Sequence, residues 1–343
     1  AATLLPWALY EAYGDAEVLR RQLPSMRAWV DWAASRLDAV GVWRGDFHLG
    51  DWLDPGAPPD KPEQATTDRD FIASSYLSFS AGKLAQALHA LGDTAAAADY
   101  ENLGRRVARA TWDHWRDAAL TTQTGCAVVI VFGIAPADDV ELAGERLAQL
   151  VHQAGGRVAT GFLGTPLVLP ALTRAGQIEA AYQLLLNRDA PGWLYQVVHG
   201  ATTTWERWDA IRADGTIHTG DMAAADAASM TSFNHYAYGS VVEWFYRSLA
   251  GIAPGEPGYR RIDFAPQPGG GLAWAEAAIE TPYGPASIRW DLDPGRLVVG
   301  LRVPPGATAR FHPPRGWSIP VGVSPELGSG SHRLELGREP GEP

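Results

Sequence analysis

The chain has 343 residues, 46% of them hydrophobic, and a formal net charge of −11. It is long enough for a large core and exceeds the usual single-core size, so we expect one large domain and a smaller one. An acidic chain without a Lys/Arg cluster argues against binding to nucleic acid or to an anionic membrane surface. No apolar run approaches the roughly 20 residues that span a bilayer, and the single cysteine, Cys126, excludes an intrachain disulfide.

The first three quarters of the sequence predict helices joined by loops that contain glycine and proline. Apolar residues at alternating spacings of three and four predict an amphipathic helix over 16–40, which Pro24 interrupts. Further helices are predicted over 69–91, 93–115, 136–154, 166–175, 177–187 and 229–249. Because strands do not alternate with helices and no fixed repeat is visible, the pattern favours a toroid of α-hairpins.

The composition changes after Gly251. A stretch rich in proline and glycine, 254–258, precedes short alternating runs that predict strands over 261–264, 272–281, 286–291, 297–303 and 307–312. We therefore expect a helical domain over 1–252 and a small antiparallel β-domain over 253–343, with a frayed tail from residue 337. The expected role of the β-domain is structural, and sugar binding is the alternative.

A first loop rich in carboxylates and tryptophan spans residues 43–55. Within it, Asp51 stands beside Trp52. A carboxylate accepts hydrogen bonds from hydroxyl groups and an indole packs on a sugar ring, so the pair suits carbohydrate. The structural alternative is that Asp51 caps a turn while Trp52 packs inward.

A second such loop spans residues 200–209, where Trp205 and Trp208 flank Glu206 and Arg207. An apolar pocket would raise the pKa of Glu206, whereas Arg207 nearby would hold the carboxylate ionised. Either state suits general acid/base chemistry. The structural alternative is an ion pair at the start of a helix.

A third segment, 232–239, is predicted to open the last helix. His235 at a helix N-terminus tends to stay neutral and can donate to a hydroxyl group, although a lone histidine is more often structural. No metal-ligand spacing, nucleotide-binding loop or serine nucleophile motif occurs, so we expect neither a metal nor a cofactor.

These segments together resemble a known family. Four motifs occur in order: Gly50-Asp51-Trp52-Leu53, Thr160-Gly161-Phe162-Leu163-Gly164-Thr165-Pro166, then residues 200–209 and residues 232–239. They resemble the bacterial α-L-rhamnosidases of glycoside hydrolase family 78. The resemblance covers nearly the whole chain and implies an (α/α)6 six-hairpin toroid, incomplete at its N-terminus, followed by a small β-sandwich.

The resemblance also implies an activity and a set of site residues. The expected reaction is hydrolysis of terminal α-L-rhamnosyl groups with inversion, so the expected partner is a rhamnose-containing glycoside or oligosaccharide. Glu206 falls at the family's general base, and Trp52 and His235 fall at residues that contact the sugar. In this interpretation Trp205 and Trp208 wall the pocket with Trp52, and Asp51 holds hydroxyl groups with His235.

One departure from the family concerns the general acid. The family carries it in an Asp-Glu-Arg-Leu-Gly-Trp stretch that this chain lacks, and inversion needs two carboxyl groups about 6.5–9.5 Å apart. We therefore expect little or no activity from the isolated chain, unless Asp46, Asp51 or Asp54 substitutes for the acid. The sequence begins at Ala1 with no initiator Met or signal pattern, so we expect a truncated or processed chain and leave its localisation open.

Two alternatives remain open. A degenerate hydrolase could keep a tryptophan-lined groove and act as a non-catalytic carbohydrate-binding protein. Another helical-toroid enzyme, such as a polysaccharide lyase, would need several basic residues near a tyrosine or histidine base. The three loops are richer in acids and tryptophan, which disfavours the lyase.

Overall fold

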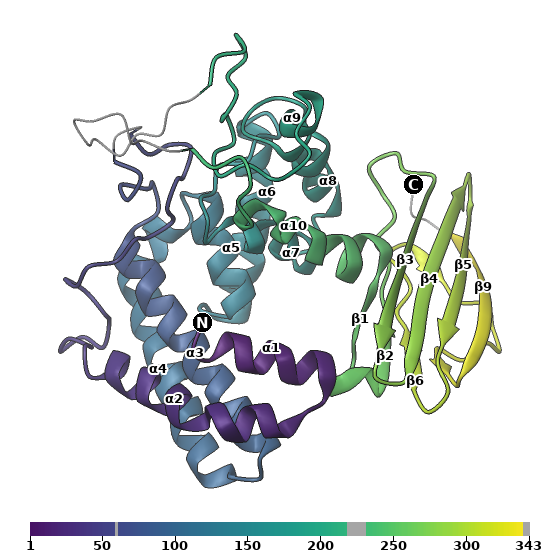
Figure 1. Ribbon diagram of the computed structural model, residues 1–343, viewed down its shortest axis with the longest axis horizontal. Helices are drawn as coiled ribbons and strands as arrows, with labels where there is room; N and C mark the ends of the chain where they lie inside the picture. Colours follow the sequence, from purple (N-terminus) through teal and green to yellow (C-terminus); the bar gives the residue numbers. More distant parts are fainter. Residues whose placement is uncertain (59–60, 218–230, 339–343) are drawn as a thin grey trace. The chain divides into compact units, whose positions relative to one another are not determined.

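The computed structural model describes residues 1–58, 61–217 and 231–338 (Figure 1). It divides into two compact units. The helical unit comprises Arg27–Gln86 and Thr94–Val241, and the sheet unit comprises Ala1–Met26, Ala87–Asp93 and Val242–Pro343. The predicted order of helices followed by a small β-domain is confirmed, while the boundary at residues 252 and 253 stays a prediction.

Ten α-helices lie in the described residues. They are α1 (Leu4–Tyr13), α2 (Ala16–Ala34), α3 (Arg69–Ala90), α4 (Thr94–Ala119), α5 (Gln123–Phe132), α6 (Ala137–Gln153), α7 (Thr165–Arg174), α8 (Ile178–Leu186), α9 (Trp193–Val198) and α10 (Val241–Trp244). The helices predicted over 69–91, 93–115, 136–154, 166–175 and 177–187 are confirmed to within a few residues at each end. None of the described helices combines the length and apolar character that crossing a membrane requires.

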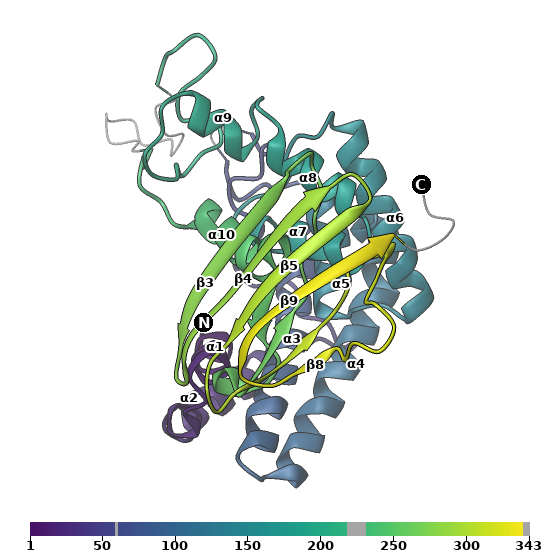
Figure 2. The same ribbon diagram turned by 90° about the vertical axis from the view of Figure 1, so that its right-hand side faces the viewer.

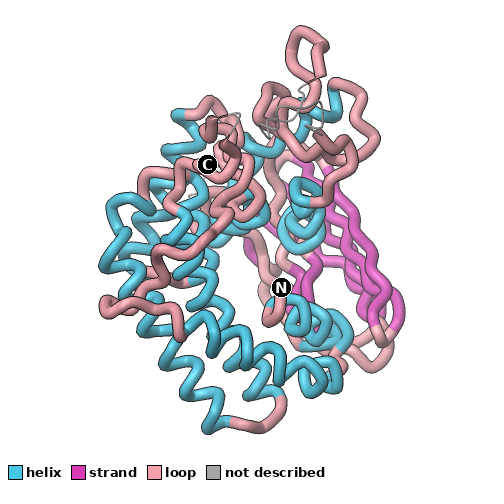
Figure 3. Tube along the Cα trace, turned by 60° about the vertical axis from the view of Figure 1, so that its left-hand side comes forward, coloured by secondary structure: helices cyan, strands magenta, loops and turns pink. Residues whose placement is uncertain are grey.

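Helices α6 and α7 pack against α5. Figure 3 distinguishes the helices, in cyan, from the strands, in magenta. The first eight residues of α5 are all buried. The Thr122 side chain accepts a hydrogen bond from Gly125 N and caps the helix, and Gly133, at a φ of 64°, ends it. A helix that is apolar all round has no polar face. Periodicity therefore did not predict it.

Two predicted helices are wrong in extent. The helix over 16–40 ends at Ala34, because Asp38 Oδ1 accepts hydrogen bonds from three backbone N–H groups of a turn, those of residues 40–42. The helix over 229–249 begins only at Ala237, where the 3-10 turn η1 (Ala237–Ser240) leads into α10 and the π-helical turn η2 (Phe245–Ala250). Its first two predicted residues lie outside the described residues.

The sheet unit contains two sheets. One has the strand order β1 (Ile252–Pro254), β2 (Arg261–Phe264), β6 (Thr308–Phe311) and β8 (Glu326–Leu327). The other, which faces the viewer in Figure 2, has the order β3 (Trp274–Thr281), β4 (Gly284–Asp293), β5 (Arg296–Val303), β9 (Gly330–Arg338) and β7 (Trp317–Ser318). All five predicted strands are confirmed.

The core of the sheet unit combines side chains from both sheets, including Phe264 of β2, Phe311 of β6 and Trp290 of β4. This packing is that of a β-sandwich. Two details differ from the sequence prediction. Strands β2 and β6 pair in parallel, which their wide separation along the chain permits. Gly337 and Arg338 belong to β9 rather than to a frayed tail, because Gly337 pairs with Arg296 of β5 and Arg338 pairs with Trp317 of β7.

Candidate active site

The segment that carries Glu206 lies against residues 232–235. The backbone N–H of Glu206 donates to the Ser232 carbonyl at 2.9 Å, and the N–H of His235 donates to the Thr204 carbonyl at 2.8 Å. These lateral bonds occupy backbone groups that a helix would need for itself. They explain why the last helix starts later than predicted, and they bring Glu206 and His235 onto adjacent segments.

The Glu206 carboxylate is half-buried and only partly engaged. Ser232 N donates to Oε2 at 2.9 Å. Within residues 1–58, 61–217 and 231–338, no hydrogen bond reaches Oε1. Arg207 forms an ion pair with Asp209, with Nε 3.6 Å from Oδ1. Glu206 therefore has one oxygen fixed by the backbone and one that can accept a proton.

His235 is also half-buried, and its ring is fixed on one nitrogen. Ala237 N donates to Nδ1 at 3.3 Å, so the neutral ring carries its proton on Nε2, where it can donate to a hydroxyl group. The ring stacks on Phe162 with centroids 4.7 Å apart. Phe162 N in turn donates to the carbonyl of Trp52 at 2.9 Å.

Phe162 thus connects two of the predicted sugar contacts, Trp52 and His235. Side-chain chemistry did not single it out, because a phenylalanine carries no reactive group. The signal that could have found it is its place inside the 160–166 motif.

The two tryptophans that flank Glu206 support the loop from its buried side. Trp205 is 2% exposed and packs with Tyr195 and Phe233. Trp208 is 3% exposed, stacks on Tyr238 at 3.8 Å and donates from Nε1 to the Thr160 carbonyl at 3.3 Å. Their buried faces hold the Glu206 loop in place.

Trp208 also lines a cavity of about 300 Å³. Asp54, Arg207 and Asp209 line the same cavity, and its apolar wall consists of Leu53, Pro55, Ala57, Pro58, Pro62, Ala190 and Pro191. Of the two tryptophans that flank Glu206, Trp208 lines this cavity and Trp205 does not. The small exposed edge of Trp208 and the Arg207–Asp209 pair face the hollow.

Asp51 lies in the interior, with 0% of its surface exposed. Its carboxylate accepts hydrogen bonds from the N–H groups of Gly161, Leu163 and Gly164 at 2.8–2.9 Å and from Thr124 Oγ1 at 2.5 Å. Burial raises the pKa of Asp51, and the bonds from Thr124 and the backbone oppose that rise. The expected contact between Asp51 and sugar hydroxyls is therefore not supported, because no part of the side chain faces solvent.

The glycines of the 160–166 motif are explained by the same contacts. A Cβ on Gly161 would lie 2.1 Å from the Asp51 carbonyl oxygen, and a Cβ on Gly164 would lie 2.1 Å from Thr124 Oγ1. Neither position has room for a side chain. The motif therefore fastens the loop that bears Trp52 to the start of α7.

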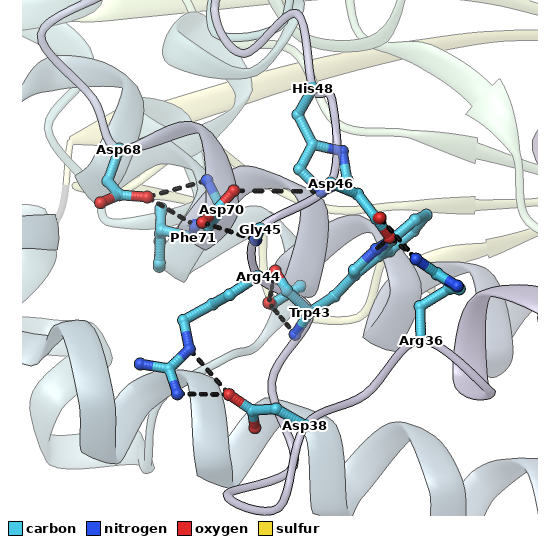
Figure 4. A network of polar contacts seen from close by, with 11 residues as sticks. Arg36, Asp38, Trp43, Arg44, Gly45, Asp46, His48, Asp68, Asp70 and Phe71 are labelled. Carbon is cyan, nitrogen blue, oxygen red and sulfur yellow. Dashed lines mark hydrogen bonds and ion pairs between the residues drawn. The ribbon is translucent and has the colours of Figure 1, made fainter.

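Asp46, the first candidate for a substitute acid, is held by charge (Figure 4). Arg36 donates to both of its oxygens at 2.6 and 2.8 Å, and Trp43 Nε1 donates at 2.7 Å. Arg36 first and Trp43 second hold the pKa of Asp46 far below its usual range. A carboxyl group in this state has no proton to donate at neutral pH.

Asp54 is the third candidate. It is 4% exposed and accepts hydrogen bonds from Gly56 N and from both the N–H and the hydroxyl of Thr66. Those donors occupy its oxygens and close its own loop. None of Asp46, Asp51 and Asp54 is therefore an accessible carboxylic acid, and no group of three metal-ligating side chains occurs in the described part of the chain.

Comparison with known families gives two matches that follow one another along the chain. Residues 1–249 match the bacterial alpha-L-rhamnosidase 6 hairpin glycosidase domain. Residues 251–318 match the bacterial alpha-L-rhamnosidase C-terminal domain. The first match alone covers more than half of the chain.

Individual proteins give the same result. An alpha-L-rhamnosidase of Streptomyces avermitilis is 38% identical over 98% of this chain, and one of Alteromonas sp. is 32% identical over 93%. The chain spans 32% and 34% of the lengths of these two relatives.

Solved structures are similar as well. That of an Aspergillus terreus rhamnosidase matches with a TM-score of 0.89 at 37% identity, over 97% of this chain and 38% of the other. That of the Streptomyces avermitilis enzyme complexed with L-rhamnose matches with a TM-score of 0.83 at 36% identity, over 97% of this chain and 32% of the other.

Proposed function

The chain belongs to the bacterial α-L-rhamnosidase family, and on that premise we propose that it provides the water-activating half of a glycoside hydrolase that removes terminal α-L-rhamnosyl groups. Family membership confirms the resemblance and the six-hairpin fold predicted from the sequence motifs. The chain spans about a third of its curated relatives, so its activity and substrate are part of this proposal.

The observation that carries the proposal is the state of Glu206. Ser232 N fixes one carboxylate oxygen at 2.9 Å, while the other accepts no hydrogen bond from the described residues. A general base needs this arrangement, because one oxygen must be oriented while the other takes the proton from water. Phe162 supports this proposal, because its ring stacks on His235, which can donate to a sugar hydroxyl group, and its backbone N–H donates to the carbonyl of Trp52.

In the proposed step, a water molecule attacks the anomeric carbon of the rhamnosyl group as the bond to the leaving group breaks. Glu206 takes the proton from that water, and the product has the inverted configuration. An alkoxide leaving group needs a proton from a second carboxyl group. Asp46 is held ionised, and Asp51 and Asp54 are buried among hydrogen-bond donors, so we propose that this chain does not supply that acid.

A substrate whose leaving group needs no proton separates the two halves of the reaction. We expect the chain to hydrolyse α-L-rhamnosyl fluoride and to leave methyl α-L-rhamnoside almost unchanged, because fluoride departs without a general acid. Product formation is followed by proton NMR, which also identifies the first-formed anomer as β. No hydrolysis of the fluoride, or hydrolysis of both substrates at similar rates, would contradict the proposal.

The matched variants are Glu206→Gln and Glu179→Gln. Glu206→Gln should lower turnover of the fluoride by about 10²–10⁴-fold, the usual contribution of a general base, while binding of methyl α-L-rhamnoside changes little. Glu179 is exposed on α8, so its variant should behave like the unchanged chain. Binding without any turnover would instead favour the non-catalytic, carbohydrate-binding alternative.

A further inference from the structure

A second hollow lies beside the Glu206 loop, with a volume of about 530 Å³. Ala190 and Asp209 line both this hollow and the smaller cavity that Trp208 lines. The two spaces therefore adjoin, and Asp209 follows Glu206 by three residues. A group bound in the larger hollow would lie next to the proposed catalytic segment.

The charged side chains of this hollow are Arg157, Arg188, Asp189, His199, Asp209 and Arg212. Both carboxylates have cationic partners already. Asp189 accepts from Arg157 Nη2 at 2.9 Å, and Asp209 is paired with Arg207 at 3.6 Å.

Arg188 and Arg212 are not compensated in this way. Their guanidinium groups form no hydrogen bond or ion pair with any residue of 1–58, 61–217 and 231–338. Asp214, two residues from Arg212, accepts hydrogen bonds from Thr216 N and Oγ1 at 2.9 and 2.7 Å, and these bonds lower its pKa more than the charge of Arg212 does. Both arginines are exposed and form no ion pair within the part of the chain that the structure describes, and two such cations at one hollow attract an anion.

Two aromatic rings, those of Tyr195 and His199, also line the hollow, and their positions are fixed. Tyr195 donates from its hydroxyl to the Ile211 carbonyl at 2.8 Å, and the His199 ring lies 4.1 Å from the Tyr195 ring. His199 Nδ1 lies 2.8 Å from the Tyr195 carbonyl. Because a carbonyl only accepts, Nδ1 carries the proton and Nε2 remains for a ligand. Aromatic rings suit the C–H faces of a sugar ring.

We propose that this hollow binds an acidic sugar, a uronic acid residue of the substrate, through its carboxylate and the guanidinium groups of Arg188 and Arg212. The sugar ring lies along Tyr195 and His199. The inference rests on the proposed function, because it places the uronic acid next to the rhamnosyl group that Glu206 serves. It therefore names the substrate class as rhamnosides that carry a carboxylate.

The test compares two disaccharides by calorimetry at low salt. One is α-L-rhamnose linked to glucuronic acid, and the other is α-L-rhamnose linked to glucose, which has a CH2OH group in place of the carboxylate. We expect the acidic disaccharide to bind about tenfold more tightly, since two exposed charge pairs each contribute up to about a factor of five. High salt should remove most of the difference.

The variants separate the two arginines from general charge effects. Arg188→Gln/Arg212→Gln should bind both disaccharides equally, and each single variant should lose part of the preference. Arg302, an exposed arginine of β5, forms no ion pair with the residues that the structure describes, so Arg302→Gln should keep the preference. Inorganic sulfate should compete only weakly, because it lacks the sugar ring.

Three results would overturn the inference: equal affinity for both disaccharides, a preference that survives the double variant, or sulfate that displaces the acidic disaccharide at similar concentrations. The neutral disaccharide reports separately on the proposed function. If the neutral disaccharide binds and the acidic disaccharide binds no more tightly, the proposed uronic acid site is wrong and the proposed rhamnoside site is retained. If the neutral disaccharide does not bind, and glucuronic acid alone has the same affinity as the acidic disaccharide, the proposed uronic acid site is retained and the proposed rhamnoside site is wrong.

Discussion

Asp51 and Glu206 are both carboxylates in tryptophan-containing motifs, and the structure gives them opposite surroundings. Asp51 is fully buried and accepts four hydrogen bonds, three of them from backbone N–H groups. Glu206 is half-buried and accepts one. The number of fixed donors therefore separates a carboxylate that holds loops together from one that can exchange a proton.

The difference shows how the two motifs cooperate. The Asp51 contacts fix residues 161–164, which places Phe162 against His235 and beside the Trp52 carbonyl. A general base at Glu206 needs fixed neighbouring segments and one carboxylate oxygen that accepts no hydrogen bond. The neighbouring segments are fixed by the contacts of other residues, including Asp51. A position next to a tryptophan does not by itself make a carboxylate a sugar ligand.

The largest expected effect on folding is that of Asp51→Ala. Removal of the carboxylate leaves three backbone N–H groups buried without partners, which should lower the free energy of unfolding by about 3–5 kcal/mol. Urea denaturation followed by circular dichroism measures it. Asp113→Ala, at an exposed ion pair of α4, should change stability by less than about 1 kcal/mol. Similar values for the two variants would break the distinction between an anchoring and an exposed carboxylate.

A smaller effect is expected at Asp46, where Arg36 and Trp43 rather than burial set the carboxylate's state. Its folded pKa lies below the unfolded value of about 3.9, so its stabilising contribution is present above that pH and is lost as the pH falls below it. The difference in unfolding free energy between the unchanged chain and Asp46→Asn should therefore be constant near neutral pH and shrink below about pH 4. A difference that grows on acidification would show that the sign is wrong.

Most helices could be predicted from the sequence because their apolar residues repeat with the helical period, as in α4 and α6. Helix α5 could not, because every side of it is buried. The start of the last helix was wrong because Ser232 and His235 bind the distant residues Glu206 and Thr204, and such long-range pairing leaves no local signal.

The candidate site divides in the same way. The motifs located Glu206, Trp52 and His235 in segments that the structure brings together. They could not show that Asp51 is sealed in the interior or that Trp205 and Trp208 present little surface. Burial depends on what packs against a residue, and for Asp51 that is a segment 110 or more positions away along the chain.

Chemical rescue tests the central claim most directly, namely that Glu206 activates water while Asp51 only holds the loops. Glu206→Ala should lose turnover of α-L-rhamnosyl fluoride, and added azide, an anion that attacks without losing a proton, should restore fluoride release and give β-L-rhamnosyl azide. Asp51→Ala should show no rescue. Failure of azide to restore turnover in Glu206→Ala, or rescue of Asp51→Ala instead, would contradict the account.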